Sequence, residues 1–164
     1  MLQPVTQAFE SLLPEQLFFL RALSEHGVEF TVVGGYAMRS LGHTRLTNDL
    51  DLVIKQTDDN VARVGRLLET LPDYNASGRE PCLMQPEKKV VWKGVELFST
   101  MKGFLYSEIE AESLHCQVQE LRVRTMSLEH MKRAKTLALA ALDRHGKKDI
   151  DEADLAFLRA KSEA

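Results

Sequence analysis

The chain has 164 residues and a formal net charge of −3, with 44 % hydrophobic and 27 % charged residues. These values are ordinary for a globular protein, and the length fits a single domain, which we expect over 1–164. The acidic balance excludes a global positive field that would draw the whole molecule to nucleic acid or to a membrane, but it does not exclude a local basic patch.

Neither a membrane segment nor a metal-binding cysteine motif is predicted. No apolar run approaches the ~20 residues that span a bilayer, and the N-terminal MLQPVTQAFESLLPEQ lacks the basic start and apolar core of a signal peptide. Cys82 and Cys116 have no CxxC spacing and no histidine cluster beside them, which favours free thiols over a zinc site. We therefore expect a cytoplasmic protein with no membrane partner.

Helices and strands are expected to alternate in the first half of the chain. Pro14 and Gly27 have the residue types that begin and end a helix, and VEFTVV reads as a short buried strand. Gly34-Gly35 ends that strand. The elements expected up to residue 72 are a helix over 14–26, a strand over 28–33, helical turns over 36–41, a strand over 49–54 and a helix over 58–71 capped by Thr57 or Asp58.

The second half predicts two strand pairs and two C-terminal helices. After a loop over 73–81, we expect strands at 89–92 and 95–99, a helical stretch near 104–112, strands at 114–119 and 121–126, a helix from Ser127 to about Arg144, and a final helix over 150–162. This order predicts an α/β (α+β) fold in which helices pack on a mixed sheet. The core would cover about 28–126, followed by a helical C-terminal tail over about 127–162.

An acidic-apolar alternation begins the strand at 49–54. Side chains two apart on a strand share one face, so Asp49 and Asp51 would point one way while Leu50 and Leu52 point to the core. Two adjacent carboxylates repel unless a cation lies between them, and Mg²⁺ is normally held by one or two carboxylates plus substrate phosphate. A half-exposed strand that binds no metal would show the same pattern, so the alternation alone is compatible with both interpretations.

Other polar residues surround this acidic pair. Gly34-Gly35 follows a buried strand and opens a helix, which allows backbone N–H groups to approach a phosphate, although such a pair also serves as a plain turn. Arg45 and Thr47 lie in the loop between and offer a charge and a hydroxyl. Glu96 interrupts an apolar strand, where an unpaired carboxylate is costly, so it either joins a metal site or faces solvent.

Taken together, VVGGYAMRSLGHTRLTNDLDLVI resembles the signature of the polymerase-β-like nucleotidyltransferases. The subgroup that it is most similar to is the bacterial set with GG-x-A and R-x-T-x-D-x-D, which includes AbiEii-like abortive-infection toxins. The resemblance covers about 28–54 closely and extends loosely to Glu96, where the family usually carries a third metal-binding Asp. It implies a polymerase-β-like palm fold and a metal-dependent transferase.

The C-terminal helices resemble a second part of this pattern. The family has a lysine in a K-x-x-A-like setting followed by D-x-x-D-L-x-x-L, which here match Lys135 and the segment beginning at Asp151. Lys135 also falls on an apolar helix face with Met131 and needs an anionic partner or a route to water. Alternatively the apolar stripe runs through Ala134 and Leu137 and leaves Lys135 exposed. We expect Asp151 to be the functional acid and Asp149 to form a capping box with Glu152.

The resemblance implies transfer of an NMP from an NTP to an acceptor, with Mg²⁺ or Mn²⁺ as cofactor. Asp49, Asp51 and Glu96 would bind the metal, Gly34, Gly35 and Thr47 would contact the nucleotide, and Arg45 and Lys135 would neutralise its phosphates. The acceptor would be tRNA or a protein, with a cognate toxin or antitoxin as partner. A cluster of basic residues could contact RNA phosphates or form a solvated surface. It comprises Arg122, Arg124, Lys132, Arg133 and Lys135. A non-catalytic member of the same fold is the alternative.

Overall fold

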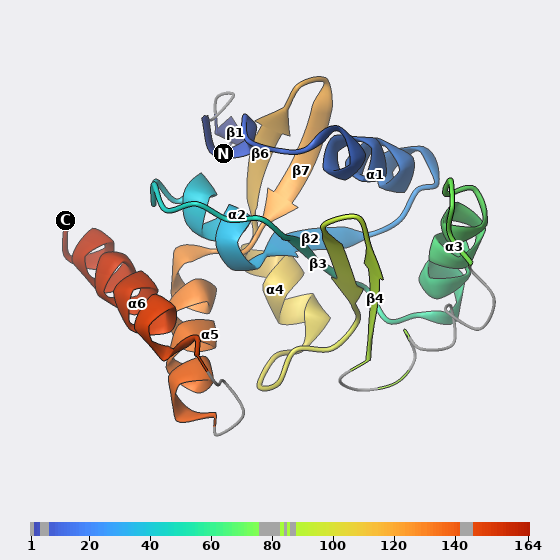
Figure 1. Ribbon diagram of the computed structural model, residues 1–164. Helices are drawn as coiled ribbons and strands as arrows, with labels where there is room; N and C mark the ends of the chain where they lie inside the picture. Colours follow the sequence, from blue (N-terminus) through green and yellow to red (C-terminus); the bar gives the residue numbers. More distant parts are fainter. Residues whose placement is uncertain (1, 4–6, 76–82, 84, 86–87, 142–145) are drawn as a thin grey trace.

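A computed structural model of the chain describes residues 2–3, 7–75, 83, 85, 88–141 and 146–164. Its strands form one mixed sheet in the order β1-β6-β7-β2-β3-β5-β4 (Figure 1). The strands are β1 (Leu2–Gln3), β2 (Phe30–Val33), β3 (Leu50–Ile54), β4 (Lys89–Trp92), β5 (Val95–Phe98), β6 (Leu114–Val118) and β7 (Leu121–Thr125). Antiparallel pairs join β2 to β3, β4 to β5 and β6 to β7, while β3–β5, β2–β7 and β1–β6 are parallel.

Helices cover both faces of the sheet. They are η1 (Gln7–Phe9), α1 (Pro14–Glu25), α2 (Gly34–Ser40), α3 (Asp58–Glu69), α4 (Tyr106–Glu112), α5 (Leu128–Ala140) and α6 (Lys148–Glu163). Figure 1 shows α5 and α6 packed side by side at one end of the molecule. Among the described residues, no helix has the length and apolar character required to cross a bilayer.

The pleat of β3 divides its side chains between two cores. Leu50, Leu52 and Ile54 are fully buried in the larger core with α1 and α3, whereas Val53 lies in the second core with α2 and α5. Because alternate side chains of a strand share a face, Asp51 lies on the Val53 side. The expected burial of Leu50 and Leu52 is confirmed.

Most predicted elements are confirmed, and their caps explain why. The hydroxyls of Thr57 and Ser127 accept hydrogen bonds from the backbone N–H groups of Asn60 and His130 and so begin α3 and α5. Gly27 follows α1 with φ +66°, the left-handed conformation that ends helices. Cys116 is a buried free thiol; Cys82 and most of the predicted loop over 73–81 lie outside the described residues.

Two predictions about helix ends are wrong, and two short elements were not predicted. Helix α5 ends at Ala140, before the predicted Arg144, because Ala141 has an extended backbone. Asp149 does not cap α6: the cap position is Lys147, without a side-chain hydrogen bond, and Asp149 is an exposed residue inside the first turn. The short elements β1 and η1 were not expected, since neither is long enough to show periodicity.

Candidate active site

Asp51 and Glu96 lie next to each other on the parallel strands β3 and β5. They are register partners, and both are partly buried. The Oδ1 atom of Asp51 is buried with no hydrogen-bond partner among the described residues. Asp49 precedes β3 and is exposed, and Thr47 Oγ1 donates a hydrogen bond to its carbonyl oxygen at 3.4 Å. The structure therefore gathers the three predicted acidic residues at one end of β3.

The two partly buried carboxyl groups hold their protons differently. Burial, followed by the contact with Glu96 and the charges of Glu96 and Asp49, raises the pKa of Asp51 to about 8. Burial also acts to raise the pKa of Glu96, but hydrogen bonds with Lys89 and Asp51 hold it below its ordinary value. Two neighbouring carboxyl groups in a low dielectric share one proton in this way. Without a bound cation, Asp51 is the protonated partner at neutral pH.

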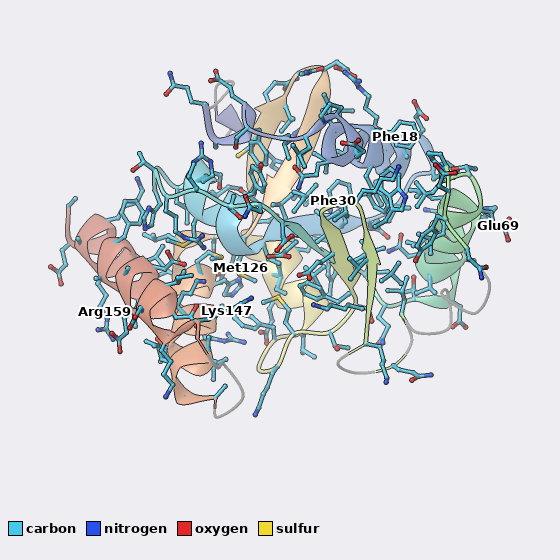
Figure 2. All side chains as sticks on the ribbon, in the orientation of Figure 1. Phe18, Phe30, Glu69, Met126, Lys147 and Arg159 are labelled. Carbon is cyan, nitrogen blue, oxygen red and sulfur yellow. The ribbon has the colours of Figure 1, made fainter. Side chains whose placement is uncertain are left out.

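Two lysines supply positive charge to this pair. Lys89 Nζ lies 2.8 Å from Glu96 Oε1. The charge of Lys147, which is labelled at the start of α6 in Figure 2, acts to lower the pKa values of Asp51 and Glu96, although burial keeps that of Asp51 raised. Lys89 was not a predicted site residue. No sequence signal indicated it, because its contact with Glu96 depends on the register of β4 against β5, in which Lys89 shares the face of Val91, the register partner of Glu96.

The diglycine makes room for the side chains of the site. A Cβ atom on Gly34 would overlap Oδ2 of Asp51 and lie 3.1 Å from its Cγ and 3.2 Å from its Cβ. A Cβ atom on Gly35 would overlap Oγ1 of Thr47 and lie 2.7 Å from its Cβ. The first reason for glycine at both positions is therefore close packing of Asp51 and Thr47, in addition to any approach of a phosphate.

Replacing Gly34 with Ala is expected to destabilise the fold by about 2–5 kcal/mol. The residue has φ +65°, which costs a β-carbon residue roughly 1–2 kcal/mol, and overlap with a packed side chain adds about 1–3 kcal/mol. Gly146→Ala is the matched control, because Gly146 has φ +75° but nothing within 4 Å of its added Cβ. Urea unfolding measures both variants; equal losses would show that Asp51 does not pack against this turn.

A buried ion cluster connects the C-terminal helices to the loop before Asp49. Lys135 is nine-tenths buried, with Nζ 3.2 Å from Asp151 Oδ1 and 2.9 Å from Asp154 Oδ2. Arg45 donates to the same Asp154 carboxylate from Nε at 2.8 Å and from Nη2 at 3.1 Å. His43 Nε2 lies 3.4 Å from Asp154 Oδ1. Asp151 and Asp154 are fully buried.

This cluster decides between the two predicted orientations of Lys135. The lysine is inside, whereas Leu137 is 38 % exposed, so the alternative stripe through Leu137 is wrong. Lys135 and Arg45 are both bound by carboxylates in this structure, and Asp151 and Asp154 contact cations of the chain. Asp154 was not in the predicted site. The sequence does indicate it, because it lies three residues after Asp151 on the helix face of Leu155 and Leu158. A charge buried on that face needs a partner.

The predicted basic concentration is largely neutralised by acidic neighbours. The ion pairs are Arg124–Glu110 at 3.2 Å, Lys132–Glu129 at 3.7 Å, Arg133–Glu108 at 3.1 Å and the Lys135 contacts above. Within the described part of the chain, Arg122 alone of the five makes no ion pair. A mostly paired, solvated surface therefore describes this region better than a free basic patch.

The carboxylates of Asp51 and Glu96 could bind a metal ion together with its other ligands. Among the described residues, no group of three or more His, Cys, Asp or Glu side chains is arranged to hold a metal ion by itself. Two carboxylates from Asp51 and Glu96 nevertheless fit Mg²⁺, which completes its coordination with water and substrate phosphate. A cation would coordinate the unpartnered Oδ1 of Asp51 and would offset the repulsion between the Asp51 and Glu96 carboxylates.

Comparison with known proteins supports the fold. The sequence matches no protein-family model, and no curated protein matches it. Among solved structures, the chain is similar to the crystal structure of an antigenic nucleotidyltransferase-like protein from Paracoccidioides brasiliensis, with a TM-score of 0.55 and 19 % identity, over 86 % of this chain and 72 % of that one. The mixed sheet and its helices thus have a nucleotidyltransferase-like fold.

Proposed function

We propose that this chain is a metal-dependent nucleotidyltransferase that transfers an NMP from an NTP to an acceptor, with release of pyrophosphate. The observation that carries the proposal is the in-register pair of Asp51 and Glu96, in which Asp51 packs against Gly34. A partly buried carboxyl group with an unpartnered oxygen destabilises a fold unless a ligand completes it. Its place on a nucleotidyltransferase-like fold supports a catalytic reason for retaining it.

Asp51 and Glu96 would hold Mg²⁺ or Mn²⁺, with Asp49 available as a third acidic ligand at the exposed edge. The bound ions would neutralise the carboxylates and the triphosphate and would stabilise the attacking and leaving oxygens. Glu96 would also accept the proton of an acceptor hydroxyl. Lys89, released from its 2.8 Å contact with Glu96, would become available to the pyrophosphate leaving group.

The nucleotide would lie against the diglycine turn. Backbone N–H groups of Gly34 and Gly35 and the hydroxyl of Thr47 would contact its phosphates. Asp154 partly neutralises the charges of Arg45 and Lys135. We therefore assign these two residues mainly to positioning the loop that leads to Asp49. Lys147 supplies the charge that the C-terminal helices bring within electrostatic range of the two acids.

We place the protein, from its GG-x-A and R-x-T-x-D-x-D segments, among bacterial AbiEii-like, toxin-type nucleotidyltransferases of the cytoplasm. The corresponding acceptor is the end of a tRNA, or else a protein, and the corresponding partner is a cognate toxin or antitoxin. Because four of the five predicted basic residues have acidic partners, an RNA acceptor rests on the resemblance more than on surface charge.

One observation favours a second function. Lys89 already neutralises Glu96, and Asp151 and Asp154 together already neutralise Arg45 and Lys135, so most charges of the site are satisfied without a ligand. This favours a non-catalytic member of the fold that binds nucleotide or acts as the partner in a two-gene system.

Transfer of label from α-labelled NTPs separates the two functions. The protein is incubated with each NTP, total tRNA and a cell extract, with Mg²⁺, Mn²⁺ or EDTA. An enzyme labels RNA or protein only when the metal is present, and heat-denatured protein gives the background. Nucleotide binding without transfer to any acceptor would support the non-catalytic function instead.

The stability of the metal-free protein is expected to fall between about pH 6.5 and pH 8. Asp51 has a folded pKa raised to about 8 from 3.8, so the folded state binds more protons than the unfolded state in this range and loses stability as pH rises. The lowered pKa values of His43 and His115 act in the opposite direction and reduce the slope near pH 6.5, but this effect fades above about pH 7, and the lowered pKa of Glu96 acts at lower pH still.

Urea unfolding at several pH values measures this slope with EDTA and with saturating Mg²⁺. Metal binding to ionised Asp51 should flatten or reverse the slope. A stability that is level from pH 6.5 to pH 8 without metal would contradict the buried, protonated state of Asp51.

A further inference from the structure

A hollow of about 520 Å³ lies where the sheet separates between β2 and β7. The two strands share a single register pair, Val32 with Thr125, and the N–H of Met126 donates to the carbonyl of Val32. Before this point the strands diverge, and α1 closes the gap from one side. None of the three acidic site residues lines the hollow.

One wall of the hollow is basic. His115, Arg122 and Arg124 line it and share one face of the β6–β7 hairpin, since His115 and Arg124 are register partners and Arg122 is two residues before Arg124. Arg124 contacts Glu110 at 3.2 Å, whereas Arg122 makes no ion pair within the described residues. The His115 Nδ1 atom is buried and has no hydrogen-bond partner among them. Burial and the two arginines lower the pKa of His115.

The rest of the lining is largely apolar. Leu20 and Val28 are buried, Leu121 and Val123 alternate with the two arginines along β7, and Phe30 is labelled in Figure 2 near α1. The single acid in the lining, Glu29, is 3.5 Å from Lys55 and is thereby compensated. The volume is within the range of small-molecule sites, which combine an apolar lining with a few polar groups.

We propose that this hollow binds a small phosphate ester whose carbon portion lies against the apolar part of the lining. The phosphate group would accept hydrogen bonds from the Arg122 and Arg124 guanidinium groups, with the His115 ring beside it. A planar guanidinium group can donate two parallel hydrogen bonds to two oxygens of one phosphate, and within the described residues Arg122 has no ion-pair partner that would compete for it. The site is separate from the one assigned to NTP.

Phenyl phosphate is the probe, titrated into the full chain with EDTA present so that the acidic site is not loaded with metal. Calorimetry measures the affinity, and ¹H–¹⁵N NMR locates the perturbed residues. Inorganic phosphate and phenol are titrated in parallel to separate the anionic from the apolar contribution. Arg122→Gln tests the site. Its matched control is Arg21→Gln, which removes the same charge from the nearby surface of α1, where Arg21 pairs with Glu120 at 2.7 Å.

Phenyl phosphate should bind more tightly than inorganic phosphate, phenol should not bind, and the shifts should centre on β7 and His115. Loss of a charge-assisted hydrogen bond should weaken binding by about tenfold or more in Arg122→Gln, with little change in Arg21→Gln. The proposal is overturned by absence of phenyl phosphate binding, by equal affinity for inorganic phosphate, or by equal effects of the two substitutions.

Discussion

Asp51→Asn should abolish nucleotidyl transfer while leaving the fold as stable as the wild type, or more stable, above pH 8. A metal ion contributes several kcal/mol of transition-state stabilisation, so loss of its ligand lowers the rate by on the order of 10³-fold or more. The amide does not ionise, so it avoids the penalty that raises the pKa of Asp51 to about 8. Activity and stability should therefore change in opposite directions.

Asp59→Asn is the matched control, because Asp59 is a largely exposed acid on α3, paired with Arg63 at 2.8 Å. Its transfer rate and its stability should both stay close to the wild type. Label transfer measures the first quantity and urea unfolding at pH 6.5 and pH 8.5 the second. If Asp51→Asn keeps full activity, or loses stability in parallel with activity, the residue is a structural one.

Asp154→Ala should produce the largest loss of stability, about 3–5 kcal/mol, because it leaves Arg45 and Lys135 without a shared buried partner. For a chain of this size each kcal/mol corresponds to about 2–4 °C in Tm. Arg45 precedes Asp49 in the same loop, so the residual folded protein should also transfer nucleotide more slowly. Thermal unfolding and label transfer measure the two effects.

Asp149→Ala provides the comparison on the same helix. Asp149 is exposed and does not cap α6, so its replacement should change stability by no more than about 0.5 kcal/mol. If Asp154→Ala is equally mild, then the buried cluster does not connect α5 and α6 to the loop before Asp49.

Local signals in the sequence were sufficient for much of the fold. Thr57 and Ser127 cap helices through their own hydroxyls, and Pro14 fixes the start of α1, so these boundaries depend on neighbouring residues only. The alternation in Asp49–Leu52 likewise placed Leu50 and Leu52 inside. The predicted end of α5 at about Arg144 is wrong because no glycine or proline marks the true end, where the backbone becomes extended at Ala141.

Long-range contacts were the part that the sequence did not provide. The pairing of Lys89 with Glu96 depends on the register of β4 against β5, and the contact of Arg45 with Asp154 joins residues 109 positions apart. The sequence indicates that a buried charge needs a partner, but only the packing shows which residue that partner is. In the structure, Arg45 and Lys135, which were expected to bind phosphate, belong to an internal ion cluster instead.

A crystal structure with Mn²⁺ and a non-hydrolysable NTP would show whether Asp51 and Glu96 bind the catalytic metal, because the anomalous signal of manganese locates the ion. We expect manganese bound by the carboxylates of Asp51 and Glu96, with Asp49 beside it and the triphosphate over Gly34. Manganese at another place, or a nucleotide bound away from β3 and β5, would contradict it.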